Sequence, residues 1–284
     1  VVKCQTAEEV YIQLERKEPV SIVLTGSEYN LTKPFLISKG VLFAGNKKKP
    51  ITIRSESMMA IFLIAGNGNL DLQNLTIKGE NIRATHFISS DSTGSSNHYN
   101  LNMRNCWISE LDRDNGCSTI FYAYKYMVAD SIIIQKNYFG YNNTNGIIMD
   151  GEKDDKGYYN AEKIDISNNE FNSLSGVLLN IYRGGNDEST MGPQLTFSHN
   201  RVKDCKDNTG KPLFSFTGVQ VTKILSNSFG DCNRGLTLIL YKDTVRARHY
   251  FEKNSLFNSG TLIKDQFVTE KDNLIITEKE NSPN

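Results

Sequence analysis

The chain has 284 residues, with 32 Lys and Arg against 32 Asp and Glu, so its formal net charge is zero. This balance argues against a general nucleic-acid binder, which needs a basic surface. No apolar run approaches the ~20 residues of a membrane-spanning helix. With 38% hydrophobic residues, 14 Phe and 13 Tyr, the composition is that of a folded protein. About 30 residues are asparagine.

Residues 1–18 are predicted to form an N-terminal segment with a short capping α-helix. Thr6 and Glu9 have the spacing of a capping box at a helix start. Apolar residues four positions apart then form one stripe of a helix over residues 7–16. We expect this helix to cover the open end of the structure that follows.

Residues 19–270 contain an eight-residue phrase that recurs seven times. Its first part alternates like a strand, and an asparagine near its end is expected to turn the chain. The phrases are LDLQNLTI from Leu70, LNMRNCWI from Leu101, IIIQKNYF from Ile132, IDISNNEF from Ile164, LTFSHNRV from Leu195, TKILSNSF from Thr222 and HYFEKNSL from His249. Their asparagines are Asn74, Asn105, Asn137, Asn169, Asn200, Asn227 and Asn254. The starts are 31, 31, 32, 31, 27 and 27 residues apart.

Most phrases are followed by a second apolar run, so one repeat holds two or three short strands. Stacking such units predicts an all-β fold, a right-handed parallel β-helix with roughly eight or nine coils. A β-propeller, with ~40–45 residues per blade, and a leucine-rich repeat, with ~20–29, explain the phrase less well. The equivalent asparagines can stack into a ladder of side-chain amides. Residues 271–284 are predicted to be a frayed C-terminal tail.

The five cysteines show no CxxC spacing, so neither a disulfide framework nor a zinc site is predicted. Cys205 and Cys232 each lie five residues after the asparagine of their phrase, and we expect them to stack as buried thiols. Trp107, the only tryptophan, is expected to be packed rather than to serve as a platform for a sugar.

Two long polar loops interrupt the repeat, at residues 150–160 and 182–193. Both follow apolar strands of adjacent coils, so they should emerge side by side. Mixed charges beside tyrosine rings suit an acidic polysaccharide, because Arg can bind a carboxylate through two hydrogen bonds and Tyr offers an apolar ring face. A cluster of ion pairs that ties the two loops together is the alternative. The predicted substrate-binding residues are Lys156, Tyr158, Tyr159, Tyr182, Asn186, Asp187 and Glu188.

The strings EKDDKG and YRGGNDEST in these loops resemble polysaccharide lyase family 6, the β-helix family of alginate lyases and chondroitinase B. The chain is most similar to the C-terminal β-helix of two-domain alginate lyases. The resemblance implies β-elimination of uronate-containing, alginate-like glycans in a secreted or periplasmic bacterial protein. It also implies an N-terminal catalytic β-helix as partner. The chain starts at Val1 rather than Met, as a processed or excised chain does.

In that family a calcium ion neutralises the substrate carboxylate, a lysine is the base, and an arginine is the acid or stabiliser. Arg183 matches the arginine, and Lys153 is the candidate for the lysine. The coil from Asn143 to Asp150 lacks the acidic pair that would hold calcium, so no metal ligand is assigned. The resemblance therefore implies a supporting lyase domain. The alternatives are a non-catalytic carbohydrate-binding β-helix and a structural or adhesive solenoid.

Overall fold

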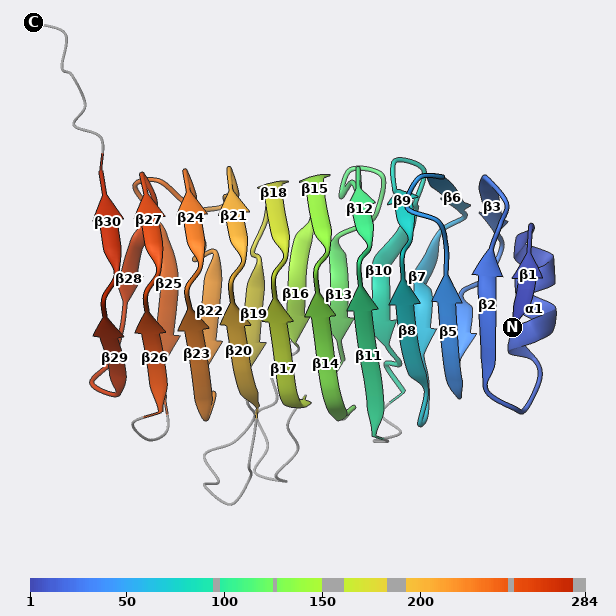
Figure 1. Ribbon diagram of the computed structural model, residues 1–284, viewed down its shortest axis with the longest axis horizontal. Coiled ribbons are helices and arrows are strands. Elements are labelled where there is room, and N and C mark those ends of the chain that lie inside the picture. The colour runs from blue at the N-terminus through green and yellow to red at the C-terminus, as the bar shows by residue number, and fades with distance from the viewer. Residues whose placement is uncertain (94–97, 125–126, 150–160, 183–192, 245–247, 278–284) are drawn as a thin grey trace, which may run out of the picture.

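Nearly all of the regular secondary structure in the computed structural model is parallel β-strand. The structure describes residues 1–93, 98–124, 127–149, 161–182, 193–244 and 248–277. Within these ranges there are 30 strands and one helix, and the strands form three long parallel sheets. Figure 1 shows the coils stacked in one row, from α1 at one end to β30 at the other. The predicted all-β, right-handed parallel β-helix with a short N-terminal helix is confirmed.

Each sheet takes one strand from every coil. Sheet A consists of β1 (Val2–Cys4), β2 (Val20–Leu24), β5 (Gly40–Ala44), β8 (Asn69–Gln73), β11 (Tyr99–Arg104), β14 (Ala129–Gln135), β17 (Ala161–Ser167), β20 (Gln194–Ser198), β23 (Val221–Leu225), β26 (His249–Glu252) and β29 (Val268–Lys271). Sheet B consists of β3 (Glu28–Leu31), β6 (Ile51–Ser55), β9 (Thr76–Lys78), β12 (Trp107–Ser109), β15 (Tyr138–Asn142), β18 (Glu170–Leu174), β21 (Arg201–Lys203), β24 (Ser228–Gly230), β27 (Ser255–Phe257) and β30 (Leu274–Ile276). Sheet C consists of β4 (Phe35–Ile37), β7 (Met58–Ile64), β10 (Ala84–Ser90), β13 (Thr119–Ala123), β16 (Asn145–Met149), β19 (Leu179–Tyr182), β22 (Phe214–Thr217), β25 (Thr237–Lys242) and β28 (Thr261–Ile263).

The described strands from β2 to β28 make nine complete coils, in agreement with the prediction of eight or nine. Alternate side chains of most strands point inward, so the three sheets enclose one continuous apolar core. The predicted start of the tail at residue 271 was wrong. Leu274 of β30 pairs with Ser255 of β27, because a further ladder asparagine, Asn273, closes one more corner.

The helix α1 (Ala7–Leu14) closes the N-terminal end, as predicted. The Thr6 hydroxyl accepts a hydrogen bond from the Glu9 backbone N–H at 3.2 Å, and the Glu9 carboxylate accepts one from the Gln5 N–H at 2.5 Å. The Thr6 contact satisfies an N–H group that the helix start leaves free, and the Glu9 contact satisfies the N–H of the residue before the N-cap. In the part of the chain that the structure describes, no helix is long and apolar enough to cross a membrane.

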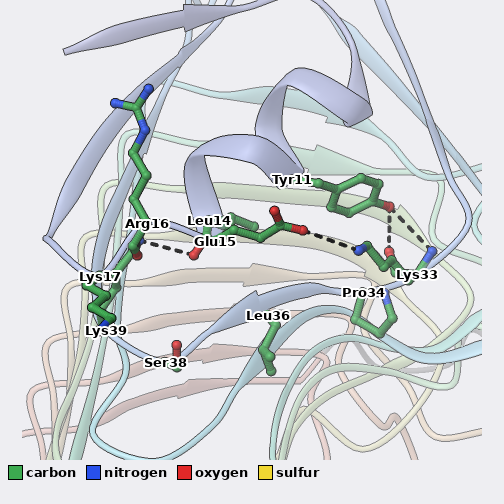
Figure 2. Close-up of a pocket in the computed structure, with 10 residues that line it drawn as sticks. All are labelled: Tyr11, Leu14, Glu15, Arg16, Lys17, Lys33, Pro34, Leu36, Ser38 and Lys39. Atoms are coloured by element: carbon green, nitrogen blue, oxygen red, sulfur yellow. Dashed lines mark hydrogen bonds and ion pairs between the residues drawn. The ribbon is translucent and has the colours of Figure 1, made fainter.

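A pocket lies between α1 and β4, and Figure 2 shows that its polar groups hold the cap in place. The Lys39 ammonium donates to the carbonyl oxygens of Gln13 and Leu14 at 3.2 and 3.1 Å, at the C-terminal end of the helix. The Tyr11 hydroxyl donates to the Lys33 carbonyl oxygen at 2.7 Å. These contacts join Tyr11 and Lys39 to the backbone across the pocket, so we interpret this pocket as part of the cap.

An asparagine ladder runs along the corner between sheets A and B. Its members are Asn137, Asn169, Asn200, Asn227, Asn254 and Asn273. From Asn169 onward, each side-chain oxygen accepts two hydrogen bonds from the preceding asparagine, one from its backbone N–H and one from its side-chain amide, at 2.9–3.2 Å. The ladder therefore satisfies buried polar groups in successive coils.

The prediction that all seven phrase asparagines turn the chain was wrong. The left-handed turn falls one residue before the ladder, for example at Lys136 with φ of 58°. In the first two phrases, Asn74 and Asn105 occupy this turn position, with φ of 54° and 55°. Cys106 then stands at the ladder position and donates its N–H to the Asn137 side chain at 2.8 Å. Of the seven phrase asparagines, two therefore turn the chain and five belong to the ladder.

The thiols of Cys205 and Cys232 are fully buried against each other, as predicted, and burial raises the pKa of Cys205. The prediction that Trp107 is packed was wrong, because 47% of it is exposed. Trp107 opens β12, and its neighbour Ile108 takes the inward position. The alternation of the strand therefore sends the indole to the outer face.

Candidate functional site

The two predicted loops begin and end on neighbouring strands. They leave sheet C from β16 and β19, which pair in parallel at Ile147 with Leu179 and at Ile148 with Asn180. They re-enter sheet A at β17 and β20, which pair at Lys163 with Gln194. The described ends of both loops thus lie in adjacent coils, at the same corner of the β-helix.

Most of the predicted site residues lie outside the described residues. This group consists of Lys153, Lys156, Tyr158, Tyr159, Arg183, Asn186, Asp187 and Glu188. Tyr182 is described: it ends β19, is partly buried, and pairs in register with Thr217 of β22. Asn180, in the same strand, lines a groove on the outer face of sheet C.

This sheet C groove has a volume of about 380 Å³. Its lining consists of His86, Ser118, Thr119, Tyr122, Asn145, Ile148, Val177, Asn180, Lys211, Pro212 and Ser215. Tyr122, Ile148, Asn180 and Ser215 pair in sequence across four strands, so they form one row along the axis of the β-helix. Three steps of ~4.8 Å give this row a length of ~14 Å. The groove is shaped for an extended ligand.

A buried imidazole lies at one end of the groove. The His86 ring stacks on Tyr122, with 4.6 Å between ring centroids and 20° between planes. Its Nε2 lies 3.2 Å from the Tyr124 hydroxyl. Only 4% of His86 is exposed, and burial lowers its pKa to about 4, so the ring is neutral at pH 7. Sequence reasoning missed this cluster, because His86 and Tyr122 meet only through strand register.

We predict that His86 weakens the fold as the pH falls. Burial lowers its pKa in the folded chain from 6.5 to about 4, so the unfolded chain binds this proton at a higher pH. The contribution of neutral His86 to the free energy of unfolding is fully present above its pKa in the unfolded chain. It is lost as the pH falls toward its pKa in the folded chain, by up to ~3 kcal/mol. His86→Gln should therefore flatten the decline measured by urea unfolding between about pH 7 and about pH 5. His98, whose ring is exposed, provides the control variant His98→Gln. Equal declines in the wild type and His86→Gln would contradict the prediction.

The side-chain amides of Asn143, just before β16, and Asn145, at its start, form hydrogen bonds within the protein. The Asn145 side-chain oxygen accepts a hydrogen bond from the Val177 N–H at 3.1 Å, and its amide donates to the Ser118 carbonyl oxygen at 3.0 Å. The Asn143 amide donates to a carboxylate oxygen of Asp112 at 2.8 Å. These contacts tie neighbouring coils together beside the groove.

The described lining of the sheet C groove offers no acidic ligand for the calcium ion that the resemblance implies. Calcium takes six to eight oxygen ligands, usually with carboxylates among them, whereas no carboxylate lines the sheet C groove. The nearby oxygen of Asn145 is already engaged. Across the described ranges, no group of three or more His, Cys, Asp or Glu side chains could hold a metal ion.

No protein-family profile and no curated protein sequence matches the chain. Among solved structures, the PL6 family alginate lyase AlyGC matches 98% of this chain and 39% of its own, with a TM-score of 0.81 and 21% identity. A mutant of AlyGC in which an arginine is replaced by alanine matches 99% of this chain and 38% of its own, with a TM-score of 0.76 and 21% identity. The chain spans less than half the length of these structures. The match over nearly the whole of this chain shows that it has the fold of the parallel β-helix in a PL6 family alginate lyase.

Proposed function

We propose that this chain is a β-helix domain of a polysaccharide lyase that acts on uronate-containing, alginate-like glycans. We assign it the supporting role of a C-terminal module beside an N-terminal catalytic β-helix, in an exported bacterial protein. The observation that carries the proposal is the similarity, over 98% of the chain, to structures of an alginate lyase. The adjacent ends of the two predicted loops, beside a groove of extended shape, support the same reading.

The proposed reaction makes specific demands on the site. A base removes the proton α to the uronate carboxylate, the bond to the glycosidic oxygen breaks, and a carbon–carbon double bond remains. The carboxylate must be neutralised and the leaving oxygen must be protonated or stabilised. Arg183 and Lys153 are the residues of this chain that correspond best to the family's charge stabiliser and base. In the supporting role we expect both to bind glycan carboxylates, beside the tyrosines and polar residues of the loops.

A non-catalytic glycan-binding role is the second candidate, and the lining of the groove favours it. Among the described lining residues, Lys211 is the one ammonium group, and the other polar groups are amides, hydroxyls and the neutral His86. A pKa of about 4 makes His86 a weak base at pH 7. Such a lining can hydrogen-bond a sugar chain and pair with a carboxylate.

The two roles are separated by assaying the chain with alginate and with chondroitin sulfate, each in calcium and in a chelator. Lyase activity appears as ultraviolet absorbance of new unsaturated uronate ends, and binding appears as retardation in affinity electrophoresis. For the supporting module we expect retention of alginate with no absorbance from the chain alone. Rapid elimination by the chain alone would contradict the supporting role, and the absence of both signals would contradict the proposed function.

Arg183→Ala and Lys153→Ala test the predicted residues. Loss of one charge-assisted contact worth ~1.4 kcal/mol should weaken retention by about tenfold. Lys223→Thr is the control, because Lys223 is an exposed cation on sheet A and the preceding coil carries Thr196 at the same register. Unchanged retention in both alanine variants would show that the loops do not bind the glycan.

A further inference from the structure

A pair of aromatic rings, one exposed and one partly buried, lies on sheet B, away from the sheet C groove. Trp107 of β12 and Tyr138 of β15 are register partners, with 4.0 Å between ring centroids and 33° between planes. Nearly half of Trp107 is exposed. The other residues in the same row are Thr76, Glu170, Arg201, Ser228, Ser255 and, in the last coil, Leu274. From Thr76 to Ser255 the row is otherwise polar, so the two rings interrupt it with an apolar face.

Neighbouring residues hold the Tyr138 ring in place. Gly140 makes room for it, because a Cβ atom at Gly140 would lie 2.2 Å from a ring carbon of Tyr138. The Asn172 amide donates to the Tyr138 hydroxyl at 3.4 Å, and partial burial raises the pKa of Tyr138, so the phenol stays neutral. The ring therefore lies along its own strand and gives Trp107 a fixed neighbour.

Three cations lie in the same hollow as the two rings. The hollow that contains Trp107 and Tyr138 has a volume of about 620 Å³, and Lys47, Lys136 and Arg201 also line it. Glu170 is the one carboxylate among its lining residues. Within the described ranges, none of the three cations makes an ion pair. Glu170 is the register partner of Arg201, so the hollow keeps a net positive charge from three cations and one carboxylate.

We propose that this hollow, the Trp107 surface, binds an acidic polysaccharide. The Trp107 surface comprises Lys47, Trp107, Lys136, Tyr138 and Arg201. A sugar ring stacks on the exposed indole face, and the carboxylates along the glycan pair with the ammonium and guanidinium groups. From the strand of Trp107 to that of Arg201 there are three inter-strand steps, or ~14 Å, so the surface accommodates an oligosaccharide rather than a single sugar.

This surface would hold a glycan at a distance from the sheet C groove. It shares the class of ligand with the proposed function but not the residues, so either can fail without the other. The observations favour a glycan over a protein partner, because the cores of protein interfaces are depleted of charged residues. Here two rings lie among three cations, with amides, a hydroxyl and His199 completing much of the lining.

The single tryptophan of the chain reports on this surface directly. We would titrate the chain with oligomannuronate and oligoguluronate, follow Trp107 fluorescence, and use neutral cello-oligosaccharides for comparison. A saturable change with the acidic oligosaccharides is expected, and it should weaken with added salt because screening reduces the attraction between charges. No change with any acidic oligosaccharide, or an equal change with the neutral ones, would overturn the proposal. In the first case a protein partner becomes the better explanation of the exposed rings.

Each test substitution introduces the residue that another coil carries at the equivalent position, so we expect the fold to be preserved. Trp107→Thr uses the residue at Thr76, and Arg201→Ser uses the residue at Ser228. Lys136→Asn uses the residue at the left-handed positions Asn105 and Asn168.

In affinity electrophoresis on alginate, Trp107→Thr and the double variant Lys136→Asn with Arg201→Ser should each weaken retention by about tenfold, the factor for a loss of ~1.4 kcal/mol. Lys223→Thr should leave retention unchanged, and circular dichroism checks that all variants are folded. Full retention in both test variants would show that the glycan binds elsewhere. Arg183→Ala should leave the Trp107 signal unaltered, which separates this surface from the predicted loop site.

Discussion

Replacing Asn169 by alanine is expected to lower the free energy of unfolding by about 3 kcal/mol. The Asn169 side-chain oxygen accepts hydrogen bonds from the Asn137 N–H and amide at 2.9 and 3.0 Å. Its amide donates to the Ile134 carbonyl oxygen at 2.8 Å and to the Asn200 side chain at 3.0 Å. Alanine leaves these buried partners without a replacement and opens a small void, and both effects destabilise the fold.

The end of the ladder supplies the control. Asn273 accepts from Asn254 and donates to the Phe251 carbonyl oxygen at 2.8 Å, but it is only partly buried and belongs to the last coil. Water can reach the groups that Asn273→Ala releases, so we expect a loss of about 1 kcal/mol. Urea unfolding followed by circular dichroism measures both variants. Equal losses would mean that the ladder contributes through local turn geometry rather than through buried hydrogen bonds.

The ladder also explains how far the sequence could predict the fold. The spacing of the phrases was sufficient to predict stacked coils, because each coil must return its corner to the same place. It could not separate the two corner positions, since asparagine suits both a left-handed turn and an amide ladder. Asn74 and Asn105 looked like a one-residue slip of the repeat, whereas they occupy the turn position. The final corner at Asn273 follows a shorter interval and was missed.

The candidate site, like the fold, could be predicted from the sequence only in part. That the two loops leave from adjacent coils could be predicted, because each loop follows an equivalent apolar strand in successive repeats. The His86–Tyr122 and Trp107–Tyr138 pairs could not, because each joins residues roughly one repeat apart whose contact depends on strand register. Side-chain alternation alone would have placed Trp107 on the outer face, since Ile108 takes the core position.

Gly146→Ala is expected to lower the free energy of unfolding by about 3 kcal/mol, at the upper end for overpacking of a core. A Cβ atom at this position would lie 2.2 Å from the Leu178 carbonyl oxygen in the next coil. That oxygen accepts the Ile147 N–H at 2.9 Å, and the Gly146 N–H donates to the Val177 carbonyl oxygen at 2.9 Å. The two coils cannot separate to make room for a methyl group without stretching these hydrogen bonds.

Gly40→Ala is the matched control for this prediction. Gly40 also lies in a strand, but its nearest neighbour would be the Pro19 side chain at 3.6 Å, an ordinary contact. We expect Gly40→Ala to change stability by no more than about 0.5 kcal/mol, because the alanine meets no clash and loses less chain entropy on folding. Thermal and urea unfolding of the two variants measure the difference. Similar values would mean that the coils near the sheet C groove can shift apart, so the position of Asn145 and Ile148 would not depend on the close approach at Gly146.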